Sequence, residues 1–422
     1  MRICFISRRY FPAISGMSVY AQNYLKEIVS LGHDVLMISQ YRNDEAGTMI
    51  YGGGPPPAVE KVEVLGLEAH GEQRVNAGHS ADFESDILAM VEVALKHHGI
   101  KPFDIVHAQY GYPNGLAALE ISRRTGIPNA VSIQGGDGHW VGLCCETHRR
   151  AIRAVFDHSN ELIIGSPSFA EEVHVNHRTP LERFTIIPGA INSERFCPRE
   201  GRTLGDVGNP PTLLYHGRVD RRKGVLELIE AVELLQSEGR VFRLVISGIG
   251  PDLETAKTLA AAKSLDHLIE FSGYVPYLDV PEVYRAADIF VSPTWSEGFS
   301  NTILEAMASG LPIVAARAVG VVDCLTDREN ALFHEVHDVA GLSRQIGALL
   351  DDAPMRRYLA ENALEEIRTK YQWPVIAKHI IERLDHIRSQ KPDNRWTEIY
   401  DPATSVADAD LTCRFRASPH LL

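Results

Sequence analysis

Two glutamates, Glu297 and Glu305, flank the start of a predicted helix in the stretch SEGFSNTILEAMASG, just after an apolar run that predicts a strand. Ser300 is a suitable N-cap for that helix. The N–H groups that open a helix favour an anion such as a phosphate. Glu305 lies to one side of the apolar stripe, where a carboxylate can accept hydrogen bonds from a vicinal diol such as a ribose. The alternative is that one glutamate is an ordinary surface residue and that the other interacts favourably with the helix dipole.

Two basic residues, Arg218 and Lys223, follow another predicted strand in the stretch YHGRVDRRKG. A strand-to-helix turn can bring both cations to one point. A diphosphate suits such a pair, because Arg donates two parallel hydrogen bonds and Lys supplies a mobile point charge. The alternative is a solvated basic loop. Arg221 and Arg222 are expected to face water.

Two loops in the first half of the chain are further candidates. Gly16 lies where a helix begins, so a phosphate or sugar could approach its bare backbone, although a single glycine could serve the turn alone. In SIQGGDGHW, Gln134, Asp137 and His139 could hydrogen-bond a polyol. His139 could also act as a base, or be an ordinary loop histidine.

The elements that must position these residues alternate between short apolar runs and helical patterns. RICFIS predicts a strand covered on both faces, and MSVYAQNYLKEIVSL predicts the helix that follows it. The same alternation restarts at TLLYHG, after a polar stretch with Gly and Pro at 199–211. The chain therefore predicts an α/β protein of two doubly wound domains separated by a cleft, with ligands beyond the carboxyl ends of the strands.

Composition limits the alternatives. A chain of 422 residues predicts two domains, and a net charge of −13 argues against a general nucleic-acid binder. The six cysteines show no C-x-x-C spacing and are expected to be buried or free thiols in a reducing compartment. The sequence shows no signal-peptide pattern and no run long enough to span a bilayer, so a cytoplasmic location is expected. No Walker loop or G-x-S-x-G motif is present.

Over roughly residues 1–390, the chain resembles a family 4 glycosyltransferase of the GT-B fold. SPTWSEGFSNTILEAMASGLPIVA is similar to the family's E-x7-E segment almost residue for residue, and YHGRVDRRKG is similar to its G-R-x4-K element. PAISGMSVYAQNYLKEIVSLGHDV resembles the N-terminal glycine loop and helix. The last helix, YQWPVIAKHIIERL, resembles the one that crosses back to the N-terminal domain in this fold.

The resemblance implies the following domain organisation. Residues 1–200 would form a Rossmann-like acceptor-binding domain, joined by the returning segment 374–395. Residues 208–373 would form a Rossmann-like donor domain, facing the first domain across a cleft. Residues 396–422 fall outside the resemblance and are expected to be a tail.

The resemblance also implies a hexosyltransferase-type reaction. A sugar would be transferred from a nucleotide-diphosphate donor with retention of its anomeric configuration. Arg218 and Lys223 would neutralise the departing diphosphate, Glu297 would meet the donor sugar, and Glu305 would hold the ribose hydroxyls. Gly16 would let the first domain close on the phosphates. In the family's proposed front-face mechanism the leaving phosphate takes the acceptor's proton, so no separate base is needed.

The remaining implied contacts come from the backbone that opens the 301–309 helix. The N–H groups after Gly298, in Phe299, Ser300 and Asn301, would bind phosphate oxygens. No cofactor or metal is expected, because the two cations replace the charge of a metal. Gln134 stands where the family usually has a histidine, which puts the contact with the donor sugar in doubt.

Several readings remain open. The main hypothesis is a transferase that uses a UDP-, GDP- or ADP-sugar to build a surface polysaccharide or glycolipid. A nucleotide-sugar epimerase or hydrolase, or a non-catalytic sugar-nucleotide-binding protein, are the alternatives. The acceptor would be a glycan or lipid-linked molecule. Seven arginines could form a cationic face for peripheral contact with an anionic membrane, or could be ordinary solvated side chains: Arg8, Arg9, Arg123, Arg124, Arg149, Arg150 and Arg153.

Overall fold

The computed structural model describes residues 1–13, 15–73 and 82–400. The chain divides into two compact units, which are described separately below. Unit 1 comprises Met1–Pro188 with the segment from Ile376 onward, and unit 2 comprises Gly189–Val375. Among the described residues, none of the helices combines the length and the apolar character needed to cross a bilayer.

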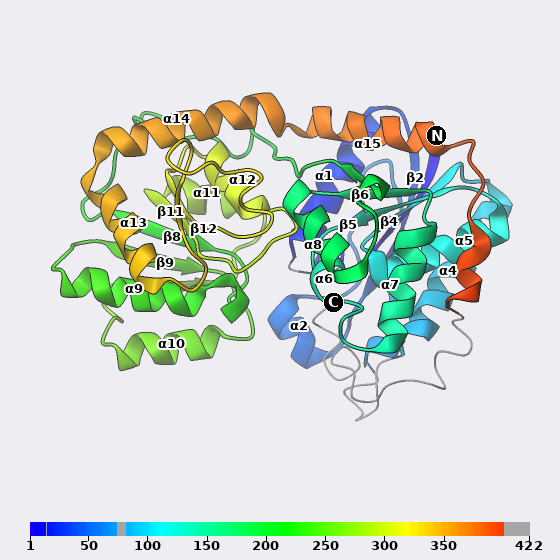
Figure 1. The fold of residues 1–422 in the computed structure, drawn as a ribbon, viewed down its shortest axis with the longest axis horizontal. Helices are drawn as coiled ribbons and strands as arrows, with labels where there is room; N and C mark the ends of the chain where they lie inside the picture. The colour runs from blue at the N-terminus through cyan, green and yellow to red at the C-terminus, as the bar shows by residue number, and fades with distance from the viewer. Residues whose placement is uncertain (14, 74–81, 401–422) are drawn as a thin grey trace. The chain divides into compact units, whose positions relative to one another are not determined.

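Within the described residues, unit 1 is built on a seven-stranded parallel sheet of order β3-β2-β1-β4-β5-β6-β7 (Figure 1). Its elements along the chain are β1 (Arg2–Ser7), α1 (Gly16–Ser30), β2 (Asp34–Tyr41), α2 (Glu45–Tyr51), β3 (Glu63–Glu68), α3 (His70–Gln73), α4 (Phe83–Ile100), β4 (Ile105–Gln109), the π-helical turn η2 (Gly111–Gly115), α5 (Leu116–Thr125), β5 (Asn129–Ile133), α6 (Gly136–His139), α7 (Glu146–His158), β6 (Glu161–Ile164), α8 (Pro167–His177), the 3₁₀ turn η3 (Leu181–Arg183), β7 (Phe184–Ile186), α15 (Trp373–Ile387) and the 3₁₀ turn η5 (Asn394–Glu398).

The central strands of unit 1 are buried on both faces. Every residue of β1, β4 and β5 is buried. Helices on the two faces of a parallel sheet produce this pattern, which is why these strands read as continuous apolar runs rather than alternating ones. Ser15 is the N-cap of α1, since its side chain accepts a hydrogen bond from the N–H of Ser18.

Within the described residues, unit 2 is built on a six-stranded parallel sheet of order β10-β9-β8-β11-β12-β13. Its elements are β8 (Thr212–His216), the 3₁₀ turn η4 (Arg221–Lys223), α9 (Val225–Ser237), β9 (Arg243–Ser247), α10 (Leu253–Ala262), β10 (Ile269–Gly273), α11 (Val280–Arg285), β11 (Ile289–Ser292), α12 (Asn301–Ala308), β12 (Ile313–Ala316), β13 (Leu332–His334), α13 (Val339–Asp351) and α14 (Ala353–Lys370).

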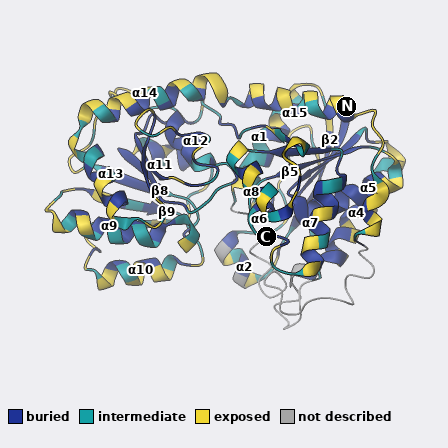
Figure 2. Cartoon of the chain, in the orientation of Figure 1, coloured by how far each residue is buried: buried dark blue, intermediate teal, exposed yellow. Residues whose placement is uncertain are grey.

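Successive side chains along a strand point to opposite faces of the sheet, and this divides the core of unit 2 into two layers. Leu214 and Phe290 point to the face covered by α11, α12 and α14. Leu213 and Ile289, their neighbours in sequence, point to the face covered by α9, α10 and α13. Figure 2 shows the result, with buried positions on the inner sides of these helices and exposed positions on their outer sides. Both layers hold the strand ends, and hence the loops beyond them, in place.

The chain passes into unit 2 between Pro188 and Gly189, upstream of the expected linker at 199–211. Two contacts explain the difference. The backbone of Ile191 hydrogen-bonds to Tyr371 at 2.8 Å, and Phe196 is fully buried in the unit 2 core. These contacts place Ile191 and Phe196 in unit 2, so the boundary lies before them. The expected linker at 199–211 consequently lies inside unit 2.

The segment 199–211 is itself anchored to unit 2. The buried carboxylate of Asp288 accepts hydrogen bonds from the N–H groups of Gly208 at 3.0 Å and Thr212 at 2.7 Å. The guanidinium of Arg356 donates to the carbonyl oxygen of Gly205 at 2.7 Å. A polar segment without periodicity is thus ordered by long-range hydrogen bonds that its own sequence does not reveal.

After α14 the chain returns to unit 1 through α15, as the resemblance implied. Arg383 of α15 pairs with the buried Glu161 of β6 at 2.8 Å. The expected tail at 396–422 differs in part, because Trp396 and Tyr400 are each only 1% exposed in unit 1. Residues 401–422 lie outside the described part of the chain.

Each sheet has one point where its strand order reverses direction. In unit 1 it lies between β1 and β4, and in unit 2 between β8 and β11. Loops at the carboxyl ends of such neighbouring strands commonly hold the ligand of a doubly wound sheet. In unit 2, the stretch with Arg218 and Lys223 follows β8, and the stretch with Glu297 follows β11.

Candidate functional site

The loops after β8 and β11 lie against each other in unit 2. Gly224, with φ +71°, ends η4, and a Cβ there would lie 2.0 Å from the carbonyl oxygen of Pro293. Only glycine permits this approach, because it has no side chain and tolerates positive φ. The N–H of Trp295 also donates to the carbonyl oxygen of Arg222 at 2.9 Å. The two loops are therefore held at a fixed separation.

This arrangement pairs two of the predicted site residues. The Nζ atom of Lys223 lies 2.7 Å from Oε1 of Glu297, with side chains 31% and 20% exposed. The N–H of Glu297 donates to the carbonyl oxygen of Val319 at 2.9 Å. A Cβ on Gly320, where φ is +73°, would lie 2.1 Å from the carbonyl oxygen of Glu297. The backbone of Glu297 is thus fixed, while its carboxylate is accessible beside a cation.

Glu305, on the second turn of α12, is more buried than the sequence suggested. It is 4% exposed, and its Oε2 atom accepts a hydrogen bond from the hydroxyl of Tyr284 at 2.8 Å. Burial raises the pKa of Glu305 to about 7, against the lowering effects of the Tyr284 hydrogen bond and the charge of Arg195. At neutral pH this carboxyl is therefore balanced between its charged and neutral forms.

The beginning of α12 differs from the expected cap. Ser300 occupies the N-cap position, but its side chain makes no capping hydrogen bond, and its hydroxyl lies 3.2 Å from that of Thr302. Gly298 is buried in the preceding loop, and Asn301 is the first helical residue. Phe299 packs on the unit 2 core, with its ring 5.8 Å from that of Tyr371. The structure therefore places these residues together at the helix N-terminus.

Arg218 lies half-buried in the loop after β8. Its carbonyl oxygen accepts a hydrogen bond from the hydroxyl of Tyr215 at 2.6 Å. Burial raises the pKa of Tyr215, the charges of Glu297 and Asp220 raise it further, and that of Arg218 lowers it. The structure therefore brings Arg218 into the same electrostatic environment as Glu297.

The other two arginines of this loop are paired within the protein. Arg221 is 59% exposed, as expected, and pairs with Asp252 at 2.7 Å. Arg222 pairs with Asp220 at 2.6 Å. Burial alone would raise the pKa of Asp220, but Arg222 holds it down at about 2. These pairs fix the loop.

The predicted polyol-binding residues lie after β5 in unit 1. The side-chain amide of Gln109 donates to Oε1 of the half-buried Gln134 at 2.8 Å. Asp137 is 0% exposed, and its carboxylate accepts from the N–H groups of Gln134 at 3.1 Å, Gly135 at 2.9 Å and Gly111 at 2.7 Å. Burial raises the pKa of Asp137 to about 6, against the lowering effect of these bonds. Asp137 therefore organises the loop through its backbone.

His139 and Gly16 have different surroundings. The Nδ1 atom of His139 lies 2.9 Å from Oε1 of Glu172, and its ring lies 4.5 Å from that of Phe169. Gly16 is exposed as the first residue of α1, at the carboxyl side of β1. Gly16 is thus accessible to a ligand, whereas His139 packs against α8.

Comparison with known proteins accounts for both units. Residues 15–190 match the family described as Glycosyl transferase 4-like domain, and residues 200–366 match Glycosyl transferases group 1. The chain belongs to the family 4 glycosyltransferases. An uncharacterized glycosyltransferase of Methanocaldococcus jannaschii is 23% identical over 394 residues, covering 90% of this chain and 97% of the relative.

Solved structures confirm the GT-B fold of this glycosyltransferase. Sucrose-phosphate synthase from Thermosynechococcus elongatus aligns with a TM-score of 0.75 at 20% identity, covering 92% of this chain and 98% of the other. HepE of Anabaena in complex with UDP and glucose aligns with a TM-score of 0.71 at 16% identity, covering 91% and 99%. The expectations of a transferase and of two Rossmann-like domains are therefore confirmed.

Sequence reasoning missed Tyr284, which contacts Glu305, and His216, which contacts Tyr284. The fully buried Tyr284 comes from α11, and its hydroxyl reaches Glu305 only through tertiary packing. The ring of His216, the last residue of β8, lies 5.4 Å from that of Tyr284. Burial lowers the pKa of His216 to about 4, so its imidazole is neutral at physiological pH. The sequence signal that could have identified His216 was its position at the end of a predicted strand.

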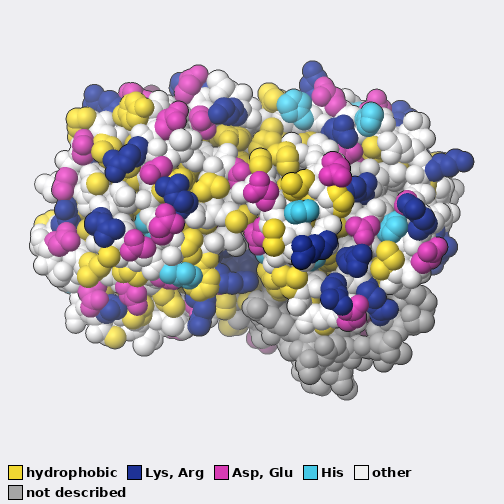
Figure 3. Space-filling model, viewed as in Figure 1, with side chains coloured by type: hydrophobic (Ala, Val, Ile, Leu, Met, Phe, Trp, Pro, Cys, Tyr) yellow, Lys and Arg dark blue, Asp and Glu magenta, His cyan; other side chains and the backbone are white. Residues whose placement is uncertain are grey.

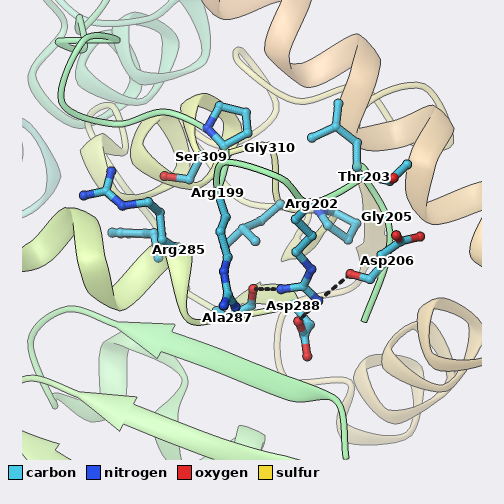
Figure 4. A pocket seen from close by; sticks show the side chains of 15 residues that line it. Arg199, Arg202, Thr203, Gly205, Asp206, Arg285, Ala287, Asp288, Ser309 and Gly310 are labelled. Atoms are coloured by element: carbon cyan, nitrogen blue, oxygen red, sulfur yellow. Dashed lines mark hydrogen bonds and ion pairs between the residues drawn. The ribbon is translucent and has the colours of Figure 1, made fainter. Parts of the chain in front are cut away.

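A pocket open to solvent lies elsewhere in unit 2 (Figure 4). It is lined by Arg199, Arg285 and the segment 202–206, and by Asp288, which precedes β11. Arg202 donates to the carboxylate of Asp288. It also donates to the carbonyl oxygen of Asp206 at 2.6 Å, as Figure 4 shows. Because this pocket adjoins the amino end of β11, it is separate from the loops that hold Lys223 and Glu297.

The cationic face expected in unit 1 is not assembled as predicted. Arg8 and Arg9 are buried. Arg123 and Arg124 both pair with Glu120 at 2.7 Å. Figure 3 shows basic side chains near α7 with acidic side chains among them, and two pairs there are Arg149 with Glu146 and Arg153 with Asp157. Much of the positive charge is thus locally neutralised.

Proposed function

We propose that this glycosyltransferase moves a sugar, with retention of its anomeric configuration, from a nucleotide-diphosphate sugar to a hydroxyl acceptor. The observation that carries the proposal is the contact between Lys223 and Glu297 at the switch point of unit 2, with Arg218 in the same loop. A cation next to an accessible carboxylate suits a ligand whose phosphate adjoins a sugar.

The charges of the loop after β8 support this assignment. When the bond between the sugar and the phosphate breaks, negative charge develops on the leaving diphosphate. Lys223, Arg218 and the N-terminus of α12 would stabilise that charge. Arg221 and Arg222 are paired with Asp252 and Asp220, and we assign them to shaping the loop.

The carboxylates would hold the two ends of the donor. Glu305 would accept hydrogen bonds from the ribose hydroxyls, with Tyr284 orienting its carboxyl group. Glu297 would accept from hydroxyls of the donor sugar. Binding of the diphosphate would draw Lys223 toward the phosphates and leave Glu297 for the sugar.

The transfer itself requires few protein groups. The bond from the anomeric carbon to the diphosphate oxygen breaks, and its electron pair stays with the diphosphate. The acceptor oxygen forms its bond on the same face, and its proton passes to a phosphate oxygen. We propose that no metal or cofactor is required, because Arg218 and Lys223 supply the positive charge.

We propose a glycan or lipid-linked acceptor that binds unit 1, with a role in surface polysaccharide or glycolipid synthesis. The exposed Gly16 and the half-buried Gln134 of that unit keep their predicted roles toward the donor phosphates and the donor sugar, and no single residue is assigned to the acceptor. A cytoplasmic location, with peripheral membrane contact, belongs to the same proposal. Sedimentation with phosphatidylglycerol vesicles tests the membrane contact, and equal binding to phosphatidylcholine vesicles would contradict it.

The proposal is tested by nucleotide binding and turnover in two variants. UDP, GDP, ADP and their common sugars are screened by thermal shift, where a ligand at 100 times its dissociation constant adds about 2.7 kcal/mol. Glu305→Gln should lose affinity for the stabilising nucleotide, whereas Glu297→Gln should keep it and lose turnover. Glu282→Gln, at an exposed position of α11, is the matched control.

The outcomes separate the alternatives. Donor consumption without an acceptor would indicate an epimerase or hydrolase, and nucleotide binding without turnover under all acceptors would indicate a binding protein. If no nucleotide stabilises the folded chain, the assignment of the site in unit 2 is wrong.

A further inference from the structure

We propose that Cys144, Cys145 and His148 form a zinc site in unit 1, distinct from the transfer chemistry proposed above. The three residues supply ligand atoms that all lie within 4.8 Å of one another. In the part of the chain that the structure describes, no other group of three or more Cys, His, Asp or Glu side chains brings its ligand atoms this close together. Their sequence, CCETH, lacks the C-x-x-C spacing by which zinc sites are usually found.

The distances fit a metal. The Nδ1 atom of His148 lies 3.2 Å from Sγ of Cys144 and 3.4 Å from Sγ of Cys145. A tetrahedral zinc with bonds of about 2.3 Å to sulfur and about 2.0 Å to nitrogen holds those ligand atoms about 3.6 Å apart. Small shifts of two side chains would therefore complete three corners of the tetrahedron. The same nitrogen faces both sulfurs, which a single S–H···N hydrogen bond does not require.

The local fold explains why an unusual spacing converges. Cys145 is the N-cap residue of α7, with extended backbone and no capping hydrogen bond from its side chain. His148 lies on the first turn of α7, so its ring returns toward the residues that precede the helix. Zinc binds the thiolate form of cysteine, so metal binding would release the proton of each thiol.

The imidazole is held rigidly. His148 is 0% exposed, and its ring lies 4.7 Å from that of Tyr112 and 6.3 Å from that of Phe83. The two cysteines are partly exposed and form no disulfide, so an ion can reach them. A preorganised ring with two accessible sulfurs is a suitable arrangement for a metal that enters after folding.

Charge and ligand type favour zinc. Two thiolates balance the charge of Zn²⁺ and the imidazole stays neutral, so the occupied site carries no net charge in its partly buried position. Two sulfurs and one nitrogen are typical zinc ligands, and three protein ligands leave a fourth position for water. The ion would join the loop after α6 to the first turn of α7, close to the segment that carries Gln134 and Asp137.

The test uses the 422-residue chain, reduced and freed of metal, then incubated with Zn²⁺ or Co²⁺ and desalted. The wild type should retain about one equivalent of zinc. With Co²⁺ it should show a thiolate-to-cobalt charge-transfer band and the visible bands of tetrahedral cobalt. Cys144→Ser and Cys145→Ser should each lose the retained metal and weaken the band. Cys197→Ser, a partly exposed cysteine of unit 2, and Cys413→Ser should leave both unchanged.

A second readout guards against misfolded variants. A chelator should lower the melting temperature of the zinc-loaded wild type and leave that of Cys145→Ser unchanged, with circular dichroism confirming that both are folded. The proposal is overturned if the wild type retains no zinc and shows no charge-transfer band, since the contacts would then be S–H···N hydrogen bonds only. Retention of copper alone would overturn the choice of zinc, and a band unaffected by either serine variant would overturn the choice of ligands.

Discussion

Replacing Tyr284 with phenylalanine should change the pH range over which this glycosyltransferase binds its nucleotide. The substitution keeps the buried ring and removes only the hydroxyl, which donates to Oε2 of Glu305 at 2.8 Å. The pKa of Glu305 is raised by burial to about 7, and the Tyr284 hydrogen bond opposes that rise. Without the hydroxyl, the ionised form of Glu305 loses its donor, so its pKa should rise further.

The magnitude follows from the strength of that bond. A hydrogen bond to a charged group contributes about 1.5–3 kcal/mol. One pKa unit corresponds to about 1.4 kcal/mol, so the midpoint should move up by about one to two pH units. If the ribose hydroxyls bind the ionised carboxylate, wild-type affinity should fall as the pH drops through 7. At pH 7 the Tyr284→Phe variant should bind about 5- to 50-fold more weakly, because the ionised fraction of Glu305 falls by that factor.

Isothermal titration calorimetry between pH 5.5 and 9.5 measures the affinity of each variant for the nucleotide. The ligand is the nucleoside diphosphate that stabilises the wild type. The nucleotide itself titrates in this range, so Glu305→Gln supplies the profile without a titrating residue at that position. Most of the affinity lost by Tyr284→Phe should return at the alkaline end. An unchanged midpoint in Tyr284→Phe, or a wild-type profile identical to that of Glu305→Gln, would refute the reasoning.

The folding stability of the unliganded protein should show the opposite trend with pH. Since the folded-state pKa of Glu305 lies above its ordinary value of 4.5, its contribution to stability is present below 4.5 and is lost as the pH rises through about 7. The same pH window should therefore strengthen nucleotide binding and weaken the empty fold. Urea unfolding with and without nucleotide separates the two effects.

Three further predictions concern single positions. Lys223→Ala should weaken binding of the nucleoside diphosphate far more than binding of the nucleoside, and equal losses in calorimetry would contradict its role at the phosphates. Gly320→Ala should lower the free energy of unfolding in urea more than Gly239→Ala does. Both glycines have positive φ, but only at position 320 would the added Cβ meet a backbone atom, the carbonyl oxygen of Glu297 at 2.1 Å. Positive φ alone costs about 1–2 kcal/mol, so comparable losses would argue against the close approach. Asp137→Asn should remove a decline in stability as the pH rises from about 4 through about 6, since the folded-state pKa of Asp137 is raised from 3.8 to about 6; a decline that persists in the variant would exclude this carboxyl as its source.

The sequence predicted what depends on local pattern. Continuous apolar runs indicated strands buried on both faces, and the loops after two of those strands contained Lys223 and Glu297. Because both loops lie at the carboxyl edge of one parallel sheet, their convergence followed from the fold class. The pairing at 2.7 Å also needed the close backbone approach at Gly224, which a single sequence does not reveal.

What sequence reasoning missed depends on contacts between distant residues. Tyr284 reaches Glu305 from another helix, and no spacing rule connects them. Asp137 appeared to be a polar group for a ligand, but three backbone N–H groups engage it within the protein. Ser300 has the residue type of an N-cap, but its hydroxyl lies near Thr302 instead. The sequence shows which polar groups exist, and tertiary packing decides which of them are still available to a ligand.

The return of the chain into unit 1 bears on how the protein is made. Glu161 is buried in β6, and its partner Arg383 lies 222 residues further along the chain. Burying the carboxylate of Glu161 without its basic partner is costly, so we expect unit 1 to reach its final state only after α15 has been synthesised. Unit 2 is continuous from Gly189 to Val375 and has no such dependence. Although domains generally fold in the order of their synthesis, here the domain that is translated later can complete its folding first.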